Sequence, residues 1–158
     1  MQIDLALLDT KHVGRLRELH QQPGVLRWWG PMEEGFPFDE PESIRLAILV
    51  DGEVAGMVQW GEEDWAHYRH AWIDIFVGDD YTRRGVGTEV VRRTVRMLIE
   101  ERGHHRITID PAADNEAAIR SYQKAGFRVV GTLRRAYRET SSDRWRDELL
   151  MELVSRAT

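Results

Sequence analysis

A strand-to-helix junction at residues 77–88 carries the first residues whose types and spacing could do chemistry. It reads Val77-Gly-Asp-Asp-Tyr-Thr-Arg-Arg-Gly85-Val-Gly87-Thr88, with two glycines at the start of a helical pattern. Glycines let backbone N–H groups face outward at a helix N-terminus, where unpaired donors and the helix dipole favour a phosphate. Arg83 and Arg84 add cationic donors. The junction therefore predicts a phosphate-binding loop, with an ordinary turn as the alternative reading of the glycine pair.

Two well-known phosphate motifs do not fit this junction. A dinucleotide G-x-G-x-x-G would need glycine at position 90, which is Val90. A nucleotide P-loop needs Gly-Lys-Ser or Gly-Lys-Thr, and the sequence contains neither. The phosphate is therefore expected to belong to another kind of ligand.

Composition narrows the remaining chemistry. The 158 residues suit one domain, 1–158, and include no cysteine, which removes disulfides, thiolate nucleophiles and thiolate metal sites. The histidines show no convincing metal partners, so no metal is expected. The formal net charge of −5 argues against nucleic acid as the main partner. With no signal peptide and no apolar run of membrane-spanning length, we expect a cytoplasmic protein that does not bind membranes.

Apolar spacing and turn residues predict a mixed α/β order, with antiparallel hairpins before a strand–helix–strand–helix unit. Asp51-Gly52 is a strong hairpin signal between two apolar runs. Thr10 and Asp114 are the expected N-caps of two helices, and a third helix begins at Gly85. Residues 21–42, rich in proline and glycine, are expected to form loop and short helical turns. The expected strands are 3–7, 44–50, 54–60, 71–77, 107–109, 127–137 and 148–154.

A second set of residues strengthens the evidence for a specific protein family. Residues 115–127 read Asn115-Glu-Ala-Ala-Ile-Arg-Ser-Tyr122-Gln-Lys-Ala-Gly126-Phe127. Together with the glycine-pair loop, this segment resembles the GNAT superfamily of N-acetyltransferases, whose pattern is Asn…Ala…Tyr-x-Lys-x-Gly-Phe after such a loop. The resemblance covers roughly residues 44–154. One position departs from the family pattern, because Thr82 stands where Gln or Arg is usual.

The resemblance implies a fold, a cofactor and a set of roles. The fold would be α/β, with a mixed, mainly antiparallel twisted sheet flanked by helices. The cofactor would be acetyl-CoA, and Tyr122 would protonate its leaving thiolate, a reasonable task for a positioned phenol. The alternative for Tyr122 is a half-buried core tyrosine. The implied cofactor-binding residues are Ile75, Phe76, Val77, Thr82, Arg83, Arg84, Gly85, Val86, Gly87, Thr88, Asn115, Ala118, Tyr122 and Lys124.

Four local segments are similar to the aminoglycoside 6′-N-acetyltransferases within this superfamily. They are Trp28-Trp29-Gly30, Trp60-Gly61-Glu62, Ile73-Asp74 and Asp110-Pro111. The similarity implies that Asp74 is the catalytic carboxylate, and that substrate is bound by Trp28, Trp29, Glu62, Asp74 and Asp110.

Carboxylates flanked by aromatic rings suit a polycationic, hydroxylated ligand, which fits this implication. Asp74 alternates with Ile73 and Ile75, so its side chain should point to the opposite face, where it could orient an amine or accept its proton. The alternatives are that Asp110-Pro111 is only a turn and that the tryptophans are partly core.

Other acceptors and a non-enzymatic role stay open. Residues 143–151 resemble the last strand of ribosomal-protein and polyamine acetyltransferases, the second candidate class. A third is an acyl-CoA-binding module without catalysis. Folds of this family often pair through sheet edges, so a homodimer is left open as an assembly.

Overall fold

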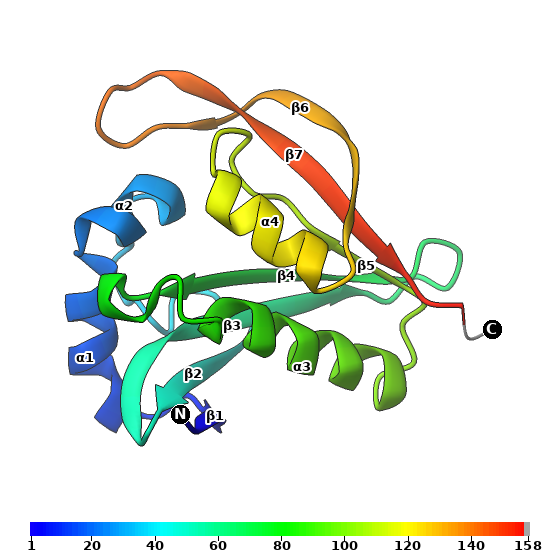
Figure 1. Cartoon of the computed structure of the whole chain (residues 1–158). Coiled ribbons are helices and arrows are strands. Elements are labelled where there is room, and N and C mark those ends of the chain that lie inside the picture. The colour runs from blue at the N-terminus through cyan, green and yellow to red at the C-terminus, as the bar shows by residue number, and fades with distance from the viewer. Residues whose placement is uncertain (157–158) are drawn as a thin grey trace.

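The chain folds around one seven-stranded sheet, seen in Figure 1, with strand order β1-β2-β3-β4-β5-β7-β6. The computed structural model describes residues 1–156. All neighbouring strands are antiparallel except β4 and β5, which run parallel. The elements are β1 (Ile3–Leu7), α1 (Thr10–His20), α2 (Pro23–Trp29), β2 (Ile44–Val50), β3 (Glu53–Glu63), β4 (His70–Val77), η1 (Asp79–Tyr81), α3 (Val86–Glu100), β5 (Arg106–Ile109), α4 (Glu116–Lys124), β6 (Arg128–Arg138) and β7 (Trp145–Val154).

Two cores form because the strands bury side chains on both faces. On β3, Met57 points to the face covered by α1 and packs with Leu16 and Leu19. Its neighbour Val58 points to the opposite face and packs with the apolar stripe of α3, which includes Val90. Both faces of the sheet centre are therefore covered, and the mixed α/β fold with a mainly antiparallel sheet is confirmed.

The sheet splits between β4 and β5. The two strands pair only at Ala71 with Ile107 and at Trp72 with Thr108. Beyond Trp72, β4 stays paired with β3 as far as Val77, so its other edge has no strand beside it. Figure 1 shows the two halves of the sheet diverging from this point, with α4 close to the opening. The split gives the molecule an exposed strand edge at its centre.

The hairpin of β6 and β7 extends toward α2 (Figure 1). Its register shifts between Leu133 and Tyr137, where β6 carries residues that β7 does not match. Arg135 adopts a positive φ of 50° in this bulge, and its N–H donates to Asp147 Oδ1 at 2.8 Å. Bulges bend a strand and re-aim its side chains. This bend directs the tip of the hairpin to the mouth of the split.

The strands and helices expected from the sequence are all present, with shifts at their ends. Two helix starts differ from expectation by one residue: α1 is capped by Asp9 rather than Thr10, and α4 by Asn115 rather than Asp114. The Asn115 side chain accepts the Ala118 N–H, which fixes the start of α4. The proline- and glycine-rich segment contains the short helix α2, with Pro23 in its first turn. Across residues 1–156, every helix is too short or too polar to cross a bilayer.

Gly56 tests how closely β3 and β4 must approach. A Cβ added there would lie 2.2 Å from the Phe76 carbonyl oxygen, a backbone atom that cannot move aside cheaply. We expect Gly56→Ala to lower the free energy of unfolding by at least about 2 kcal/mol, because overpacking forces backbone shifts. Gly131→Ala is the matched control, since a Cβ there meets no atom within 4 Å. Equal urea-unfolding midpoints for the two variants would contradict this packing account.

Candidate active site

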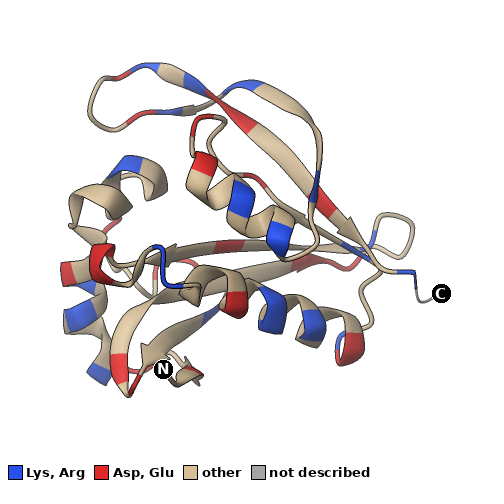
Figure 2. Cartoon of the chain, viewed as in Figure 1, with Lys and Arg blue, Asp and Glu red and all other residues tan. Residues whose placement is uncertain are grey.

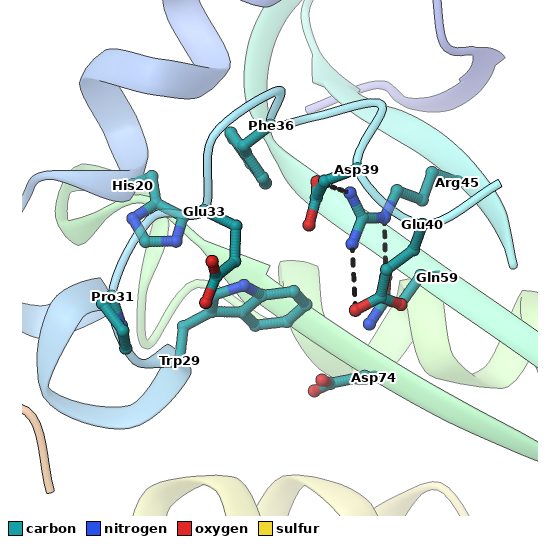
Figure 3. Close-up of a pocket in the computed structure, with 10 residues that line it drawn as sticks. All are labelled: His20, Trp29, Pro31, Glu33, Phe36, Asp39, Glu40, Arg45, Gln59 and Asp74. Atoms are coloured by element: carbon teal, nitrogen blue, oxygen red, sulfur yellow. Dashed lines mark hydrogen bonds and ion pairs between the residues drawn. The ribbon is translucent and has the colours of Figure 1, made fainter.

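Strand β4 carries Asp74 into a cleft on the α1 and α2 face of the sheet. The alternation along β4 places Asp74 on the same face as Phe76, opposite Ile73 and Ile75, as the sequence predicted. Two adjoining cavities, of about 220 and 300 Å³, share Asp74, Trp29 and Pro31 in their walls. Figure 3 shows Asp74 at the lower side of the smaller cavity. The Asp74 carboxylate therefore lies where the two cavities meet.

A row of polar side chains runs across three strands to Asp74. Arg45 on β2 donates from Nε to Gln59 Oε1 on β3 at 2.7 Å (Figure 3). Gln59 in turn is the register partner of Asp74 on β4. Because its oxygen is taken by Arg45, the Gln59 amide N–H groups are left to face the carboxylate. Sequence patterns did not single out Arg45 or Gln59, although both are polar residues in apolar strands.

The surroundings of Asp74 favour its neutral form. Water reaches the side chain through the cleft, yet protein atoms surround the carboxyl group on most sides. This desolvation, and then the nearby charge of Asp110, raises the pKa of Asp74 from 3.8 to about 7. Hydrogen bonds from the Ile75 N–H, at 2.9 Å, and from Gln59 act in the opposite direction. A carboxyl group with this pKa can both hold and release a proton near neutral pH.

Asp110 and Glu148 complete a cluster of three carboxyl groups in the larger cavity. Backbone contacts bring them together: the Leu149 N–H donates to the Pro111 carbonyl at 2.9 Å, and Ala112 bridges to Glu148. Burial, and then a hydrogen bond and charge from Asp110, raises the pKa of Glu148 to about 8. Sequence reasoning missed Glu148, because its place depends on pairing between segments more than thirty residues apart.

Aromatic side chains line the same cavity from two directions. Trp28 and Trp29 come from α2, and Tyr137 comes from the bent hairpin. Trp29 is fixed against Phe76, with ring centroids 4.9 Å apart, whereas Trp28 is covered by the Arg27 guanidinium at 4.3 Å. Carboxylates for charge and aromatic faces for sugar or alkyl groups are the features that suit a hydroxylated polycation. No group of His, Asp and Glu among residues 1–156 has an arrangement that would hold a metal ion.

The structure does not bring Glu62, a predicted substrate-binding residue, to this cluster. The Arg102 guanidinium donates to both Glu62 oxygens at 2.8 Å, and His104 Nε2 lies 2.8 Å from Oε1. These contacts, Arg102 first, lower the pKa of Glu62 to about 2. Glu62 lines neither cavity and instead ties the end of β3 to the end of α3. These contacts fit a structural role for Glu62 and leave its predicted contact with substrate as a prediction.

The glycine-pair loop forms an open helix N-terminus. Gly85 is the N-cap of α3 with φ of 81°, a left-handed conformation that glycine adopts without strain, and no side chain caps the helix. The backbone N–H groups of Val86, Gly87 and Thr88 are therefore free of a side-chain cap, as an anion site requires. Arg83 and Arg84 are exposed beside them, with Thr82 at the start of the turn. The local geometry fits a pyrophosphate.

The free edge of β4 lies next to this loop and includes Ile75, Phe76 and Val77. An unpaired strand edge offers N–H and C=O groups to an extended, amide-bearing chain. One of these donors is already used, because the Ile75 N–H bonds to Asp74 Oδ1. The remaining edge still fits the arm of coenzyme A.

Helix α4 faces the loop and the split. It is tied to α3 by one side chain and by its last backbone carbonyl: Thr88 Oγ1 lies 2.6 Å from Ser121 Oγ, and Arg92 donates to the Lys124 carbonyl at 2.8 Å. Tyr122 is 8% exposed; burial, and then the charges of Asp74 and Asp110, raises the pKa of its hydroxyl. The phenol therefore stays protonated near neutral pH. The remaining predicted residues of this helix are Asn115, whose amide N–H groups are not used by its cap, half-buried Ala118 and exposed Lys124.

Comparison with known proteins identifies the family. The chain belongs to the Acetyltransferase (GNAT) family of N-acetyltransferases, whose model matches residues 7–127. An aminoglycoside N(6′)-acetyltransferase type 1 from Klebsiella pneumoniae is 27% identical over 154 residues, covering 83% of this chain and 76% of the relative. A spermidine N(1)-acetyltransferase from Escherichia coli K12 is 24% identical over 143 residues, covering 83% and 75%.

Solved structures show the same fold. Spermidine N-acetyltransferase from Vibrio cholerae, in complex with CoA and spermine, superposes with a TM-score of 0.83 at 18% identity, covering 98% of this chain and 96% of that one. The aminoglycoside acetyltransferase AAC(6′)-Ib, in complex with coenzyme A and kanamycin, gives 0.76 at 23% identity, covering 97% and 95%. At these identities the structural similarity shows the fold alone. The identity of the acetyl acceptor must be inferred from the residues of the site.

The raised pKa of Asp74 predicts a pH-dependent gain in stability when its charge is removed. In the folded state the pKa is about 7 against 3.8 ordinarily, so the folded protein holds this proton more tightly than the unfolded chain. Stability is therefore lost as pH rises from about 4 to 7. We expect Asp74→Asn to raise the Tm by about 2–4 °C at pH 8 and much less at pH 5. The same Tm difference at both pH values, measured by calorimetry, would contradict this electrostatic account.

Proposed function

We propose that the chain transfers an acetyl group from acetyl-CoA to a primary amine of a polycationic small molecule, the 6′-amine of an aminoglycoside. The observation that carries the acceptor class is the cluster of Asp74, Asp110 and Glu148 facing Trp28 and Tyr137 in one cavity. Arg27 and Arg138 also line this cavity, but Arg27 lies over the Trp28 ring and Arg138 pairs with Asp143. Among residues 1–156 the three carboxyl groups therefore have no ion-pair partner, which favours an ammonium ligand, and the aromatic faces favour a ring or alkyl chain beside it. The 27% identical aminoglycoside acetyltransferase supports the same acceptor.

Acetyl-CoA would be held by the elements at the split. The N-terminus of α3, with Arg83 and Arg84, would bind the pyrophosphate, and the β4 edge at residues 75–77 would pair with the pantetheine arm. Asn115 would donate to the same arm through its amide group. The thioester supplies an activated acetyl group with a thiolate leaving group. This arrangement would present the thioester between the β4 edge and Tyr122.

Two residues of the chain, Asp74 and Tyr122, would then each take part in one proton transfer. Asp74 orients the amine toward the thioester carbonyl and accepts, directly or through water, the proton that the nitrogen loses on forming the amide bond. As the carbon–sulfur bond breaks, Tyr122 donates its proton to the leaving thiolate. The proposed transfer is direct, in a ternary complex; the absence of cysteine and of a nucleophile-elbow sequence agrees with a reaction that forms no acyl-enzyme.

The charge distribution fits a small cationic acceptor better than nucleic acid. Figure 2 shows acidic and basic segments interspersed along the helices and the hairpin in that view, and the formal net charge is −5. Nucleic-acid binding relies on a basic face, which neither observation supplies.

Polyamines are the second candidate acceptor. An acid-lined cleft suits spermidine as well as an aminoglycoside, and the spermidine acetyltransferase of Escherichia coli is 24% identical over 83% of this chain. The larger cavity, with aromatic faces on two sides, favours the bulkier ring system.

An acceptor panel tests the proposal. Thiol release from acetyl-CoA should be fast with kanamycin and be lost with an analogue whose 6′-amine is replaced by hydroxyl. Turnover only on spermidine or on an N-terminal peptide would overturn the aminoglycoside assignment and leave the acetyltransferase assignment standing. Thermal stabilisation by acetyl-CoA without turnover on any of these amines would favour a sensor without catalysis.

The Tyr122→Phe variant tests whether Tyr122 protonates the leaving thiolate. Because the phenol acts only as the carbon–sulfur bond breaks, we expect kcat to fall roughly 100-fold with little change in acetyl-CoA affinity. Tyr68→Phe is the matched control, as Tyr68 is 65% exposed on the loop between β3 and β4. Wild-type turnover in Tyr122→Phe, measured by steady-state kinetics, would remove Tyr122 from the mechanism.

A further inference from the structure

The smaller cavity is the feature that the proposed transfer leaves without a role. It adjoins the larger cavity through Asp74, Trp29 and Pro31, and has a volume of about 220 Å³. Its walls come from the end of α1, from residues 29–40 and from β2, β3 and β4, as Figure 3 shows. A ligand with one group at Asp74 thus has a second space beside it, on the far side from Asp110 and Glu148.

Negative charge exceeds positive charge in this cavity. Glu33, Asp39, Glu40 and Asp74 line it together with one cation, the buried Arg45. Arg45 contacts Asp39 at 2.6 Å and Glu40 at 3.6 Å (Figure 3). The Glu33 carboxylate has no hydrogen bond or ion pair with any residue in the range 1–156; it is exposed and lines the cavity. An uncompensated carboxylate of this kind attracts a cation.

A buried histidine adds a polar side chain to the same wall. His20 is only 1% exposed, lines the cavity, and has an Nδ1 atom without a hydrogen-bond partner among the described residues. Buried polar atoms are rarely left unpaired in a folded protein. Burial lowers the pKa of His20, so its ring is neutral near pH 7 and does not repel a cation. Figure 3 draws this ring beside the Glu33 side chain.

We propose that the cavity lined by His20, Trp29 and Glu33 is a subsite for a second, non-reacting ammonium group of the acceptor. The proposal rests on the proposed function and narrows it: the acceptor carries at least two cationic groups, placed on either side of Trp29. Asp74 stands at the junction of the two cavities and holds the reacting amine. Trp29, fixed against Phe76, offers an aromatic face to both halves of the ligand.

The subsite also explains a preference among amines. A monoamine can use only the contacts at Asp74, Asp110 and Glu148, whereas a polyamine or aminoglycoside gains an ion pair in the second cavity. This additional ion pair is expected to lower KM for the polycation and to leave kcat unchanged, because it is made equally in the ground state and the transition state.

Glu33→Gln tests the subsite, with Glu34→Gln as its matched control. The two residues are adjacent and exposed, and only Glu33 lines the cavity. We expect Glu33→Gln to raise KM for kanamycin about 10-fold with kcat unchanged, and Glu34→Gln to leave both constants at wild-type values. Methyl 6-amino-6-deoxyglucoside, which has the reacting amine alone, should show the same KM with both variants.

Three results would overturn the subsite. They are equal KM values for kanamycin in the two variants, an equal loss for the monoamine, or a fall in kcat without a change in KM. If the wild-type protein acetylates no amine, the proposed function fails, and the subsite is then tested by thermal shift with kanamycin alone. Stabilisation that is weaker in Glu33→Gln than in Glu34→Gln supports the subsite, whereas equal stabilisation refutes it.

Discussion

The separation of β4 from β5 after Trp72 is the constraint on which the rest of the site depends. Two residue pairs hold the parallel strands together, and beyond them β4 keeps only its β3 partner. The free edge and the space next to it exist for this reason. The same divergence opens space between β4 and the β5–β7 pair, so that side chains from β4, from the end of β5 and from β7 line one cavity. Parallel pairing along the whole of β4 would close both the edge and the cleft.

The site gathers negative charge that the folded protein does not neutralise. Asp74 and Glu148 have raised pKa values of about 7 and 8, so near neutral pH the cluster holds protons in place of a cation. An incoming ammonium group replaces those protons and favours the ionised carboxylates. Elsewhere the chain pairs its acids closely, as with Glu62 and Arg102 or Glu152 and Arg106. Inside the cleft, Asp39 and Glu40 contact Arg45, whereas Asp74, Asp110 and Glu148 have no cationic partner among residues 1–156. These unpaired acids support the proposal of a cationic ligand.

Much of this arrangement could be predicted from the sequence because it is local. The alternation of Ile73, Asp74 and Ile75 fixes which face Asp74 occupies once the segment is a strand. The glycine at position 85 predicts the left-handed turn at which α3 begins. The strands and helices followed from the same kind of short-range pattern, so their order was predicted correctly and their ends moved by a few residues.

The remaining features depend on contacts between distant segments, which one sequence does not reveal. Glu62 looks like part of an acidic site motif, yet Arg102 and His104, forty residues later, engage its carboxylate. Glu148 reaches the cluster only because a bulge in β6 and pairing with residues 111–113 set its position. Glu33 lies in a loop whose sequence shows only that it is polar. In each case the tertiary arrangement, rather than the local pattern, decides what surrounds the acid.

The central claim is that Asp74 holds the reacting amine at the split in the sheet, and a crystal structure with coenzyme A and kanamycin tests it most directly. The account predicts the 6′-amine within about 3 Å of the Asp74 carboxylate, as a hydrogen bond requires, with the coenzyme sulfur between the β4 edge and Tyr122. Kanamycin bound away from Asp74, or absent from the cleft while coenzyme A is in place, would contradict the account.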